Sequence, residues 1–384
     1  MKNLKKIILS SITLIGLCVI SCRDEMEVNA PEIVSVASPE GSSAGTMLGF
    51  YLLNEGNMGS NKATLDFFDF IENNYHRNIF AHANPTVPKE LGDVGNDLAI
   101  YGSKLYAVIN VSNKIEVMDK RTVRRLGQIN IPNCRYIKFH DGYAYVTSYA
   151  GPVRLDPHYE QRGYVAKVDT ATFEVVATCL VGFQPDDLEI VGEKIYVANS
   201  GGYNINAYES TVSVIDIATF TEINRIEVAE NLHRMLMDNH GVLWVSSRGN
   251  YYETPSMLHW IDLSNDVLGG TIEAPISGMT IVGDSLYFYG ADFNYITFEW
   301  KINFGIIDVV KKEIITRNFL ADGAEKKFVM PRGIMVNPTN KDIYLTDAAN
   351  FVHPGMLFCF DRHGKEKWSV QTGDIPAHFA VLYE

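Results

Sequence analysis

The sequence has few cysteines, no excess of positive charge and no hydrophobic run of transmembrane length. Five cysteines in 384 residues are too few for the disulfide framework of a small secreted domain. The apolar run at residues 7–20 is shorter than the roughly 20 residues that a membrane-spanning helix needs. The formal net charge of −13 argues against nucleic acid or an anionic membrane surface as a partner, because like charges repel.

Signatures of hydrolytic and metal-dependent enzymes are also absent. The sequence contains no HExxH motif, no GxSxG motif and no clustered Cys/His pattern. The glycine-containing run at residues 200–204 is not a phosphate cradle, because no helix is expected to follow it. We therefore expect a protein that is not an enzyme and has no intrinsic cofactor and no protein-bound metal.

What the sequence does contain is a repeated unit, marked by a hydrophobic residue followed by an aromatic one. Residues 186–220 are typical of a strand, a tight turn at Gly192, a second strand, a polar loop and a third strand, and residues 221–228 can add a fourth. Four antiparallel strands in about 45 residues is the size of one propeller blade. The second-strand pairs are Phe50-Tyr51, Leu105-Tyr106, Ala144-Tyr145, Ile195-Tyr196, Leu243-Trp244, Leu286-Tyr287 and Ile343-Tyr344.

The third strand of each unit ends at or near an aspartate. The sequence contains seven such units. The pattern predicts an all-β fold, a seven-bladed β-propeller of four-stranded antiparallel blades. The first unit has no first strand of its own, whereas residues 376–383 resemble a first strand with nothing after it. We expect this C-terminal strand to complete the first blade and close the ring, which removes exposed sheet edges. Third-strand aspartates are Asp69, Asp119, Asp169, Asp216, Asp262, Asp308 and Asp361.

The N-terminal region is typical of an exported lipoprotein. Residues 1–21 combine a basic start with a short apolar run, and residues 19–22 resemble a lipobox, so we expect cleavage before Cys22 and lipidation of its thiol. The acidic segment that follows resembles the surface-export signal of Bacteroidetes-type lipoproteins. We predict a flexible tether at residues 22–46, a propeller at residues 47–384, and a lipid-anchored protein of the outer membrane exposed at the cell surface.

Three further cysteines, Cys134, Cys179 and Cys359, form an odd set. Buried thiols on strands are the favoured interpretation. A disulfide between Cys134 and Cys179 stays open, because these two residues bracket one blade.

The connections between second and third strands are long, whereas those between first and second strands are short. The long ones span residues 149–163, 200–210, 248–257 and 291–303, and they are rich in aromatic residues. Aromatic side chains offer large contact areas at a small entropic cost. Because function concentrates on loops held by a rigid scaffold, the face with the long loops is the candidate binding site.

Polar residues at the start of each first strand and the end of each second strand are expected to ring the central channel. In the pair Asp186-Asp187 we expect one side chain to face the channel and the other to pack. Mixed donors and acceptors ringed by aromatics suit a neutral ligand rich in amides or hydroxyls. The candidate ligand-binding residues are Asn54, Asp97, Arg135, Tyr149, Asp187, Asn199, Tyr203, His233, Arg248, Tyr251, Tyr252, Phe293, Tyr295, Trp300, Arg332, Asp347 and His378.

The runs IYVANS (residues 195–200), VSVIDIAT (212–219) and YLLNEGNMGSNKATLDFFD (51–69) resemble the YncE-like seven-bladed propellers. Together with the lipobox and the acidic tether, the whole-chain pattern looks like the BtuG-type corrinoid-binding lipoproteins. This resemblance implies capture of vitamin B12 or related cobamides and their transfer to a TonB-dependent outer-membrane transporter. It assigns no site residues, since no short motif is diagnostic of corrinoid binding.

Two other functions remain open. Aromatic platforms serve sugars equally well, so a glycan-binding accessory lipoprotein of a saccharide importer is one alternative. A propeller hydrolase or lyase is the other, and it would need His233, His378 and Asp347 to meet across the channel.

Overall fold

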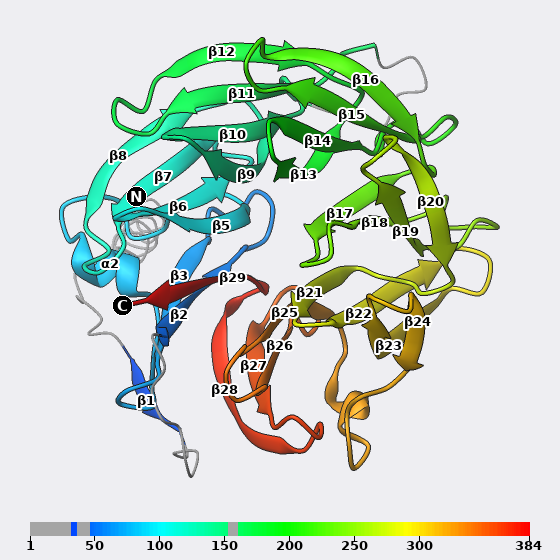
Figure 1. Ribbon diagram of the computed structural model, residues 1–384. Coiled ribbons are helices and arrows are strands. Elements are labelled where there is room, and N and C mark those ends of the chain that lie inside the picture. Colours follow the sequence, from blue (N-terminus) through cyan, green and yellow to red (C-terminus); the bar gives the residue numbers. More distant parts are fainter. Residues whose placement is uncertain (1–31, 37–46, 153–159) are drawn as a thin grey trace, which may run out of the picture. The chain divides into compact units, whose positions relative to one another are not determined.

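Seven antiparallel sheets are arranged in a ring in the computed structural model (Figure 1). The structure describes residues 32–36, 47–152 and 160–384. The expected signal peptide and the lipidated Cys22 therefore lie outside the described residues.

The strands of each blade are given from the centre of the ring outward. Blade 2 contains β5 (Gly95–Tyr101), β6 (Lys104–Ile109), β7 (Lys114–Asp119) and β8 (Arg125–Asn130). Blade 3 contains β9 (Cys134–His140), β10 (Tyr143–Ser148), β11 (Tyr164–Asp169) and β12 (Val175–Leu180). Blade 4 contains β13 (Pro185–Val191), β14 (Lys194–Asn199), β15 (Thr211–Asp216) and β16 (Thr221–Glu227).

The remaining complete blades follow the same order. Blade 5 contains β17 (Leu232–Met237), β18 (Leu243–Ser247), β19 (Met257–Asp262) and β20 (Val267–Ile272). Blade 6 contains β21 (Gly278–Val282), β22 (Ser285–Asn294), β23 (Glu299–Asp308) and β24 (Glu313–Thr316). Blade 7 contains β25 (Pro331–Val336), β26 (Ile343–Asp347), β27 (Pro354–Phe360) and β28 (Glu366–Asp374).

The first blade is built from both ends of the described chain, as the sequence predicts. Its innermost strand is the C-terminal β29 (Pro376–Tyr383), which pairs antiparallel with β2 (Met47–Asn54). The outer strands are β3 (Thr64–Asp69) and β4 (Asn74–His76). A fifth strand, β1 (Ile33–Ser35), pairs with β4. Residues 33–35, which fall within the predicted flexible tether at residues 22–46, therefore contribute backbone hydrogen bonds to the blade edge.

The hydrophobic core lies between neighbouring blades and is organised by the repeated second-strand aromatics. Tyr106, Tyr196 and Trp244 have at most 2% of their surface exposed. Tyr106 belongs to a cluster shared by blades 2 and 3, and Tyr196 to one shared by blades 4 and 5. Buried aromatic side chains remove large apolar areas from water, so the motif recurs because each blade needs a large residue facing its neighbour.

The aspartates that end the third strands shape the outer turns. Asp119, for example, accepts backbone N–H bonds from Arg121 and Thr122 and a bond from the Thr122 hydroxyl. These bonds, the Thr122 backbone bond first, lower the pKa of Asp119. The same arrangement recurs at Asp169 and Asp308. The repeated aspartate is therefore a turn-forming residue.

Helix is confined to two short pieces in the described part of the chain, α2 (Ile79–Ala83) and the 3₁₀ turn η1 (Ala324–Lys327). Neither is long enough to span a membrane, and no other described segment forms a helix that could.

Candidate functional site

The starts of the innermost strands carry β-bulges that aim side chains at the channel. The register shifts in six of the seven innermost strands, at β5, β9, β13, β17, β25 and β29. A bulge interrupts the strict alternation of a strand. In the pair Asp186-Asp187, Asp187 lines a lower cavity inside the channel, whereas Asp186 is fully buried behind the lining.

A cavity of about 720 Å³ opens where these strands begin, on the face that carries the long connections. It lies at the mouth of the channel. Nine of the predicted ligand-binding residues line it: Arg135, His233, Arg248, Tyr251, Phe293, Tyr295, Trp300, Arg332 and His378.

One buried carboxylate organises the polar side of this cavity. Asp186 has no exposed surface and accepts bonds from Arg135 Nη2 at 3.2 Å and Arg248 Nη1 at 2.8 Å. The Tyr149 hydroxyl donates a third bond at 2.7 Å. Burial alone would raise the pKa of Asp186, but Arg248 and Arg135 outweigh it and hold the pKa below its usual range. Asp186 therefore stays ionised and fixes two guanidinium groups at the mouth.

A second carboxylate, Glu55, binds another arginine and a histidine of the cavity lining. Its oxygens contact Arg332 Nη2 at 2.8 Å and His378 Nε2 at 3.1 Å. Burial opposes ionisation of Glu55, but Arg332 and His378 overcome it and lower its pKa to about 2.

His233 and Arg234 are adjacent on the bulge of β17, and both line the cavity. The Arg234 guanidinium lies 4.7 Å from the centre of the Tyr136 ring. His233 Nε2 lies 3.5 Å from the Tyr136 hydroxyl. Burial, followed by the nearby arginines with Arg248 first, lowers the pKa of His233 well below its usual value. His233 is therefore a neutral ring among cations.

The aromatic side of the cavity comes mainly from a projecting hairpin. The predicted loop at residues 291–303 is instead an extension of β22 and β23, in which Phe293 pairs across the strands with Trp300. The two rings lie 5.1 Å apart. Tyr295, beyond them, stacks on Tyr252 at 5.5 Å and meets Tyr251 edge-on at 6.2 Å. Trp300, Tyr295 and Tyr252 are each about half exposed, so the hairpin offers an aromatic surface beside the channel.

Comparison with known proteins adds the family and supports the fold. Residues 48–374 match the family described as "Domain of unknown function (DUF5074)". The chain belongs to the DUF5074 family. No curated protein matches it.

Two solved structures are similar to this DUF5074 propeller. One is the hydrazine synthase of Kuenenia stuttgartiensis, with a TM-score of 0.58 and 14% identity, covering 76% of this chain and 95% of that one. The other is a protein of unknown function from Bacteroides caccae, with a TM-score of 0.45 and 13% identity, covering 88% of this chain and 99% of that one. At 14% identity, the similarity to hydrazine synthase shows only a shared fold. The TM-score of 0.45 for the second structure is too low to support any inference.

Several predicted site residues of the DUF5074 propeller do not line the cavity at the mouth. Asn199 is fully buried and holds the Gly182 amide and the hydroxyls of Thr211 and Ser213. Asn54 similarly binds Asp66 inside the first blade. The prediction placed them at the mouth because they end second strands, but their side chains turn into the blade.

Asp347 is also a structural residue. It accepts backbone bonds from Val329, Met330 and Ala349. His233 and His378 line the cavity, but Asp347 does not. The three residues therefore do not form the constellation that the hydrolase alternative required.

The other predicted residues lie below or behind the mouth. Asp97 and Asp187 line a lower cavity of about 390 Å³ inside the channel. Tyr149 is buried beneath the arginines, with Arg135 over its ring at 4.8 Å, and Tyr203 meets Tyr149 edge-on at 6.2 Å. Tyr252 lies on the outer side of the aromatic surface, in a neighbouring cavity.

Important residues missing from the prediction are Glu55, Asp186, Arg234, Tyr136 and Tyr289. Four of them stand directly beside a predicted residue in the sequence. The pairs Arg135-Tyr136 and His233-Arg234 lie at the register shifts of β9 and β17, and both members of each pair line the cavity. Tyr289 lies within β22, where the alternation alone does not separate a channel-facing tyrosine from a core one.

The three remaining cysteines are buried free thiols. A disulfide between Cys134 and Cys179 is therefore not formed. Burial raises the pKa of the Cys134 thiol to about 12, which disfavours the reactive thiolate.

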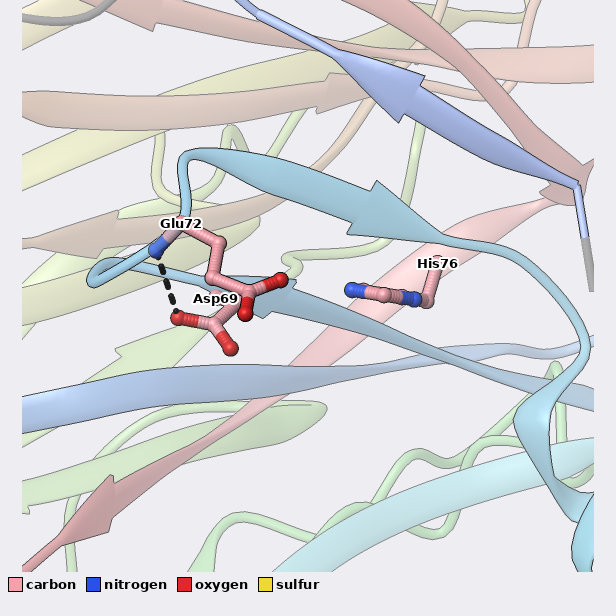
Figure 2. A group of neighbouring side chains, drawn as sticks. All are labelled: Asp69, Glu72 and His76. Atoms are coloured by element: carbon pink, nitrogen blue, oxygen red, sulfur yellow. Dashed lines mark hydrogen bonds between the residues drawn. The ribbon is translucent and has the colours of Figure 1, made fainter.

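The side chains of Asp69 and Glu72, at the turn between β3 and β4, lie close to that of His76, the last residue of β4 (Figure 2). Asp69 accepts the Glu72 backbone N–H at 3.1 Å and that of Ile71 at 2.7 Å. Asp69 is thus the first blade's example of the turn-forming aspartate, and Glu72 is exposed. The group is explained by the turn and does not add a second functional site.

Proposed function

We propose that this protein captures a large amphipathic small molecule without chemically changing it, and that the ligand is a cobamide such as vitamin B12. The supporting observation is the cavity at the channel mouth, which has one polar side and one aromatic side. Its volume of about 720 Å³ falls in the range of roughly 300–1,000 Å³ typical of small-molecule sites.

The chemistry of a corrinoid matches these two sides. Its broad macrocycle offers apolar area for the aromatic surface of Tyr251, Tyr295 and Trp300, and its peripheral amides can accept bonds from guanidinium groups. The cobalt arrives inside its own ring, so the protein need not supply metal ligands. A cobamide is larger than the cavity, and we propose that one edge enters the mouth while the macrocycle rests on the rim.

The expected lipid anchor at Cys22 and the acidic segment after it support capture at the cell surface. The partner that we propose is a TonB-dependent outer-membrane transporter, which would receive the ligand from the open side of the cavity. The likeness to hydrazine synthase supports the fold on which this proposal rests, and the ligand is left to experiment.

A glycan is the second candidate, favoured by one specific feature. Tyr252 and Tyr295 form an exposed stack with an interplanar angle of 28°, and flat exposed aromatic surfaces suit sugar rings. Hydrazine synthase is an enzyme, and we do not transfer its activity to this protein.

The test is co-elution of purified protein with cyanocobalamin in gel filtration, followed through the colour of the ligand. Isothermal titration calorimetry against an oligosaccharide panel runs in parallel. Co-elution at the protein's position supports the proposal. Heat from a saccharide with no co-elution of cyanocobalamin would favour the glycan candidate and reject the corrinoid.

A further inference from the structure

Four arginines line the one cavity at the channel mouth of a chain whose net charge is −13. They are Arg135, Arg234, Arg248 and Arg332. Since the rest of the chain is acidic, a concentration of guanidinium groups in one concave site needs an explanation beyond solubility.

Asp186 and Glu55, the carboxylates that pair directly with these arginines, leave one of the four without an ion pair among the described residues. Asp186 is shared by Arg135 and Arg248, and Glu55 serves Arg332 together with His378. Asp292 also lines the cavity, but Lys301 is its nearby cation.

Arg234 is the arginine whose charge is least satisfied by ion pairing. Within the described ranges its guanidinium forms no ion pair and lies over the ring of Tyr136. The charges of Asp187 and Asp97, which line the lower cavity, act on it from beyond ion-pair distance. Stacking on a ring leaves the N–H donors at the edge of the guanidinium plane available. Arg248 bonds Asp186 through Nη1, so its other nitrogens can also donate.

His233 adds an unused polar atom to the same place. Its Nδ1 is buried and has no hydrogen-bond partner among the described residues. An unsatisfied buried polar atom destabilises the folded protein, and such an atom is expected where a ligand completes the bond. After burial, the charges of all four arginines contribute to the lowered pKa of His233.

We propose that Arg234, Arg248 and His233 form a binding subsite for a phosphate group of the ligand. His233 and Arg234 lie at the start of β17 and Arg248 directly follows β18, so the donors come from two neighbouring strands of blade 5. A tetrahedral phosphate offers oxygens in several directions, whereas a carboxylate is planar. The inference deepens the proposed function: for a cobamide, the group is the phosphodiester that links the nucleotide loop to the macrocycle.

The test compares cyanocobalamin with dicyanocobinamide, a corrinoid that lacks the phosphodiester, by calorimetry on the unmodified propeller. The expected result is roughly tenfold to a hundredfold tighter binding of cyanocobalamin, the difference of one or two charge-assisted hydrogen bonds. Arg234→Gln should remove most of this preference, and Arg234→Lys should restore part of it. The matched control is Arg362→Gln, at an exposed residue outside the cavity. Equal binding of the two corrinoids by the unmodified protein would overturn the subsite while leaving corrinoid capture intact.

A second measurement decides the inference independently of the corrinoid. Inorganic pyrophosphate is titrated into the protein while thermal unfolding is followed. A rise in Tm that Arg234→Gln abolishes supports the phosphate subsite even when neither corrinoid binds, an outcome that would reject only the proposed function. The absence of any rise, together with no corrinoid binding, would overturn both.

Discussion

Glu55 is the residue whose charge state makes stability at the channel mouth depend on pH. Its pKa is lowered from 4.5 to about 2 by Arg332 and His378, which outweigh its burial. The folded protein therefore holds this proton less tightly than the unfolded chain does. The resulting stability is complete above pH 4.5 and is lost as the pH falls toward 2.

We expect the Glu55→Gln variant to be less stable than the parent by roughly 2 kcal/mol at pH 6, and the gap to shrink below pH 4.5. The figure allows for screening, because 43% of the Arg332 side chain is exposed and exposed pairs contribute less. Urea unfolding at pH 6, 4 and 3 measures the gap. A gap that is constant over this range would contradict the assigned ionisation.

Asn199 separates structural from ligand-binding roles among the predicted residues. Asn199 forms hydrogen bonds with three groups inside blade 4 and does not line the cavity at the channel mouth. Asn199→Ala should lower the unfolding free energy by about 2 kcal/mol, because its buried partners lose their hydrogen bonds. Ligand affinity should be unchanged. Chemical denaturation and calorimetry measure the two effects. The control is Asn224→Ala at an exposed position, expected within about 0.5 kcal/mol of the parent.

At the scale of elements, the strand repeat was predictable and its interruptions were not. The aromatic of each second strand, as at Tyr196 and Trp244, follows from the need to fill the space between blades. The alternation of polar and apolar residues along a strand does not reveal where a bulge occurs. The sequence therefore could not predict whether Asp186 and Arg234, or their neighbours, contribute to the site. The pattern at residues 291–303 predicts a loop, because its polar and aromatic residues do not alternate regularly, whereas its two ends extend β22 and β23 and residues 295–298 form the turn.

The projecting hairpin and the neighbouring connection at residues 248–257 should carry ligand contact without carrying the fold. We predict that replacing Tyr251, Tyr252 and Trp300 together with Ala weakens cyanocobalamin binding by at least thirtyfold, since one desolvated aromatic contact contributes on the order of 2 kcal/mol. Thermal stability should be nearly unchanged, because all three lie outside the clusters between blades. Calorimetry and thermal unfolding measure the two quantities.

The matched control changes three charged residues of the opposite, short-turn face: Asp141, Glu193 and Asp284. Each is exposed, and binding by this control should equal that of the parent. A folded aromatic variant that binds as tightly as the parent would move the site away from the hairpin.

At the scale of the whole molecule, ring closure depends on one strand. β29 supplies the innermost strand of the first blade and pairs with β2 over its length. Deleting residues 376–384 should therefore abolish cooperative unfolding of the whole ring, since an open propeller exposes a long sheet edge and an uncovered core. Circular dichroism melting measures this, and deletion of the exposed terminal Glu384 alone is the control. A truncated protein that still melts in one sharp transition would contradict closure by β29.

The central claim is that the ligand binds at the channel mouth, on the face with the long connections. Hydrogen–deuterium exchange of the protein with and without cyanocobalamin tests it most directly. The account predicts that the ligand slows exchange in peptides covering residues 248–257, 291–303 and the start of β17, and leaves the short turns at residues 101–103, 140–142 and 191–193 unchanged. Protection confined to those short turns, or no protection at the mouth when the ligand is bound, would contradict it.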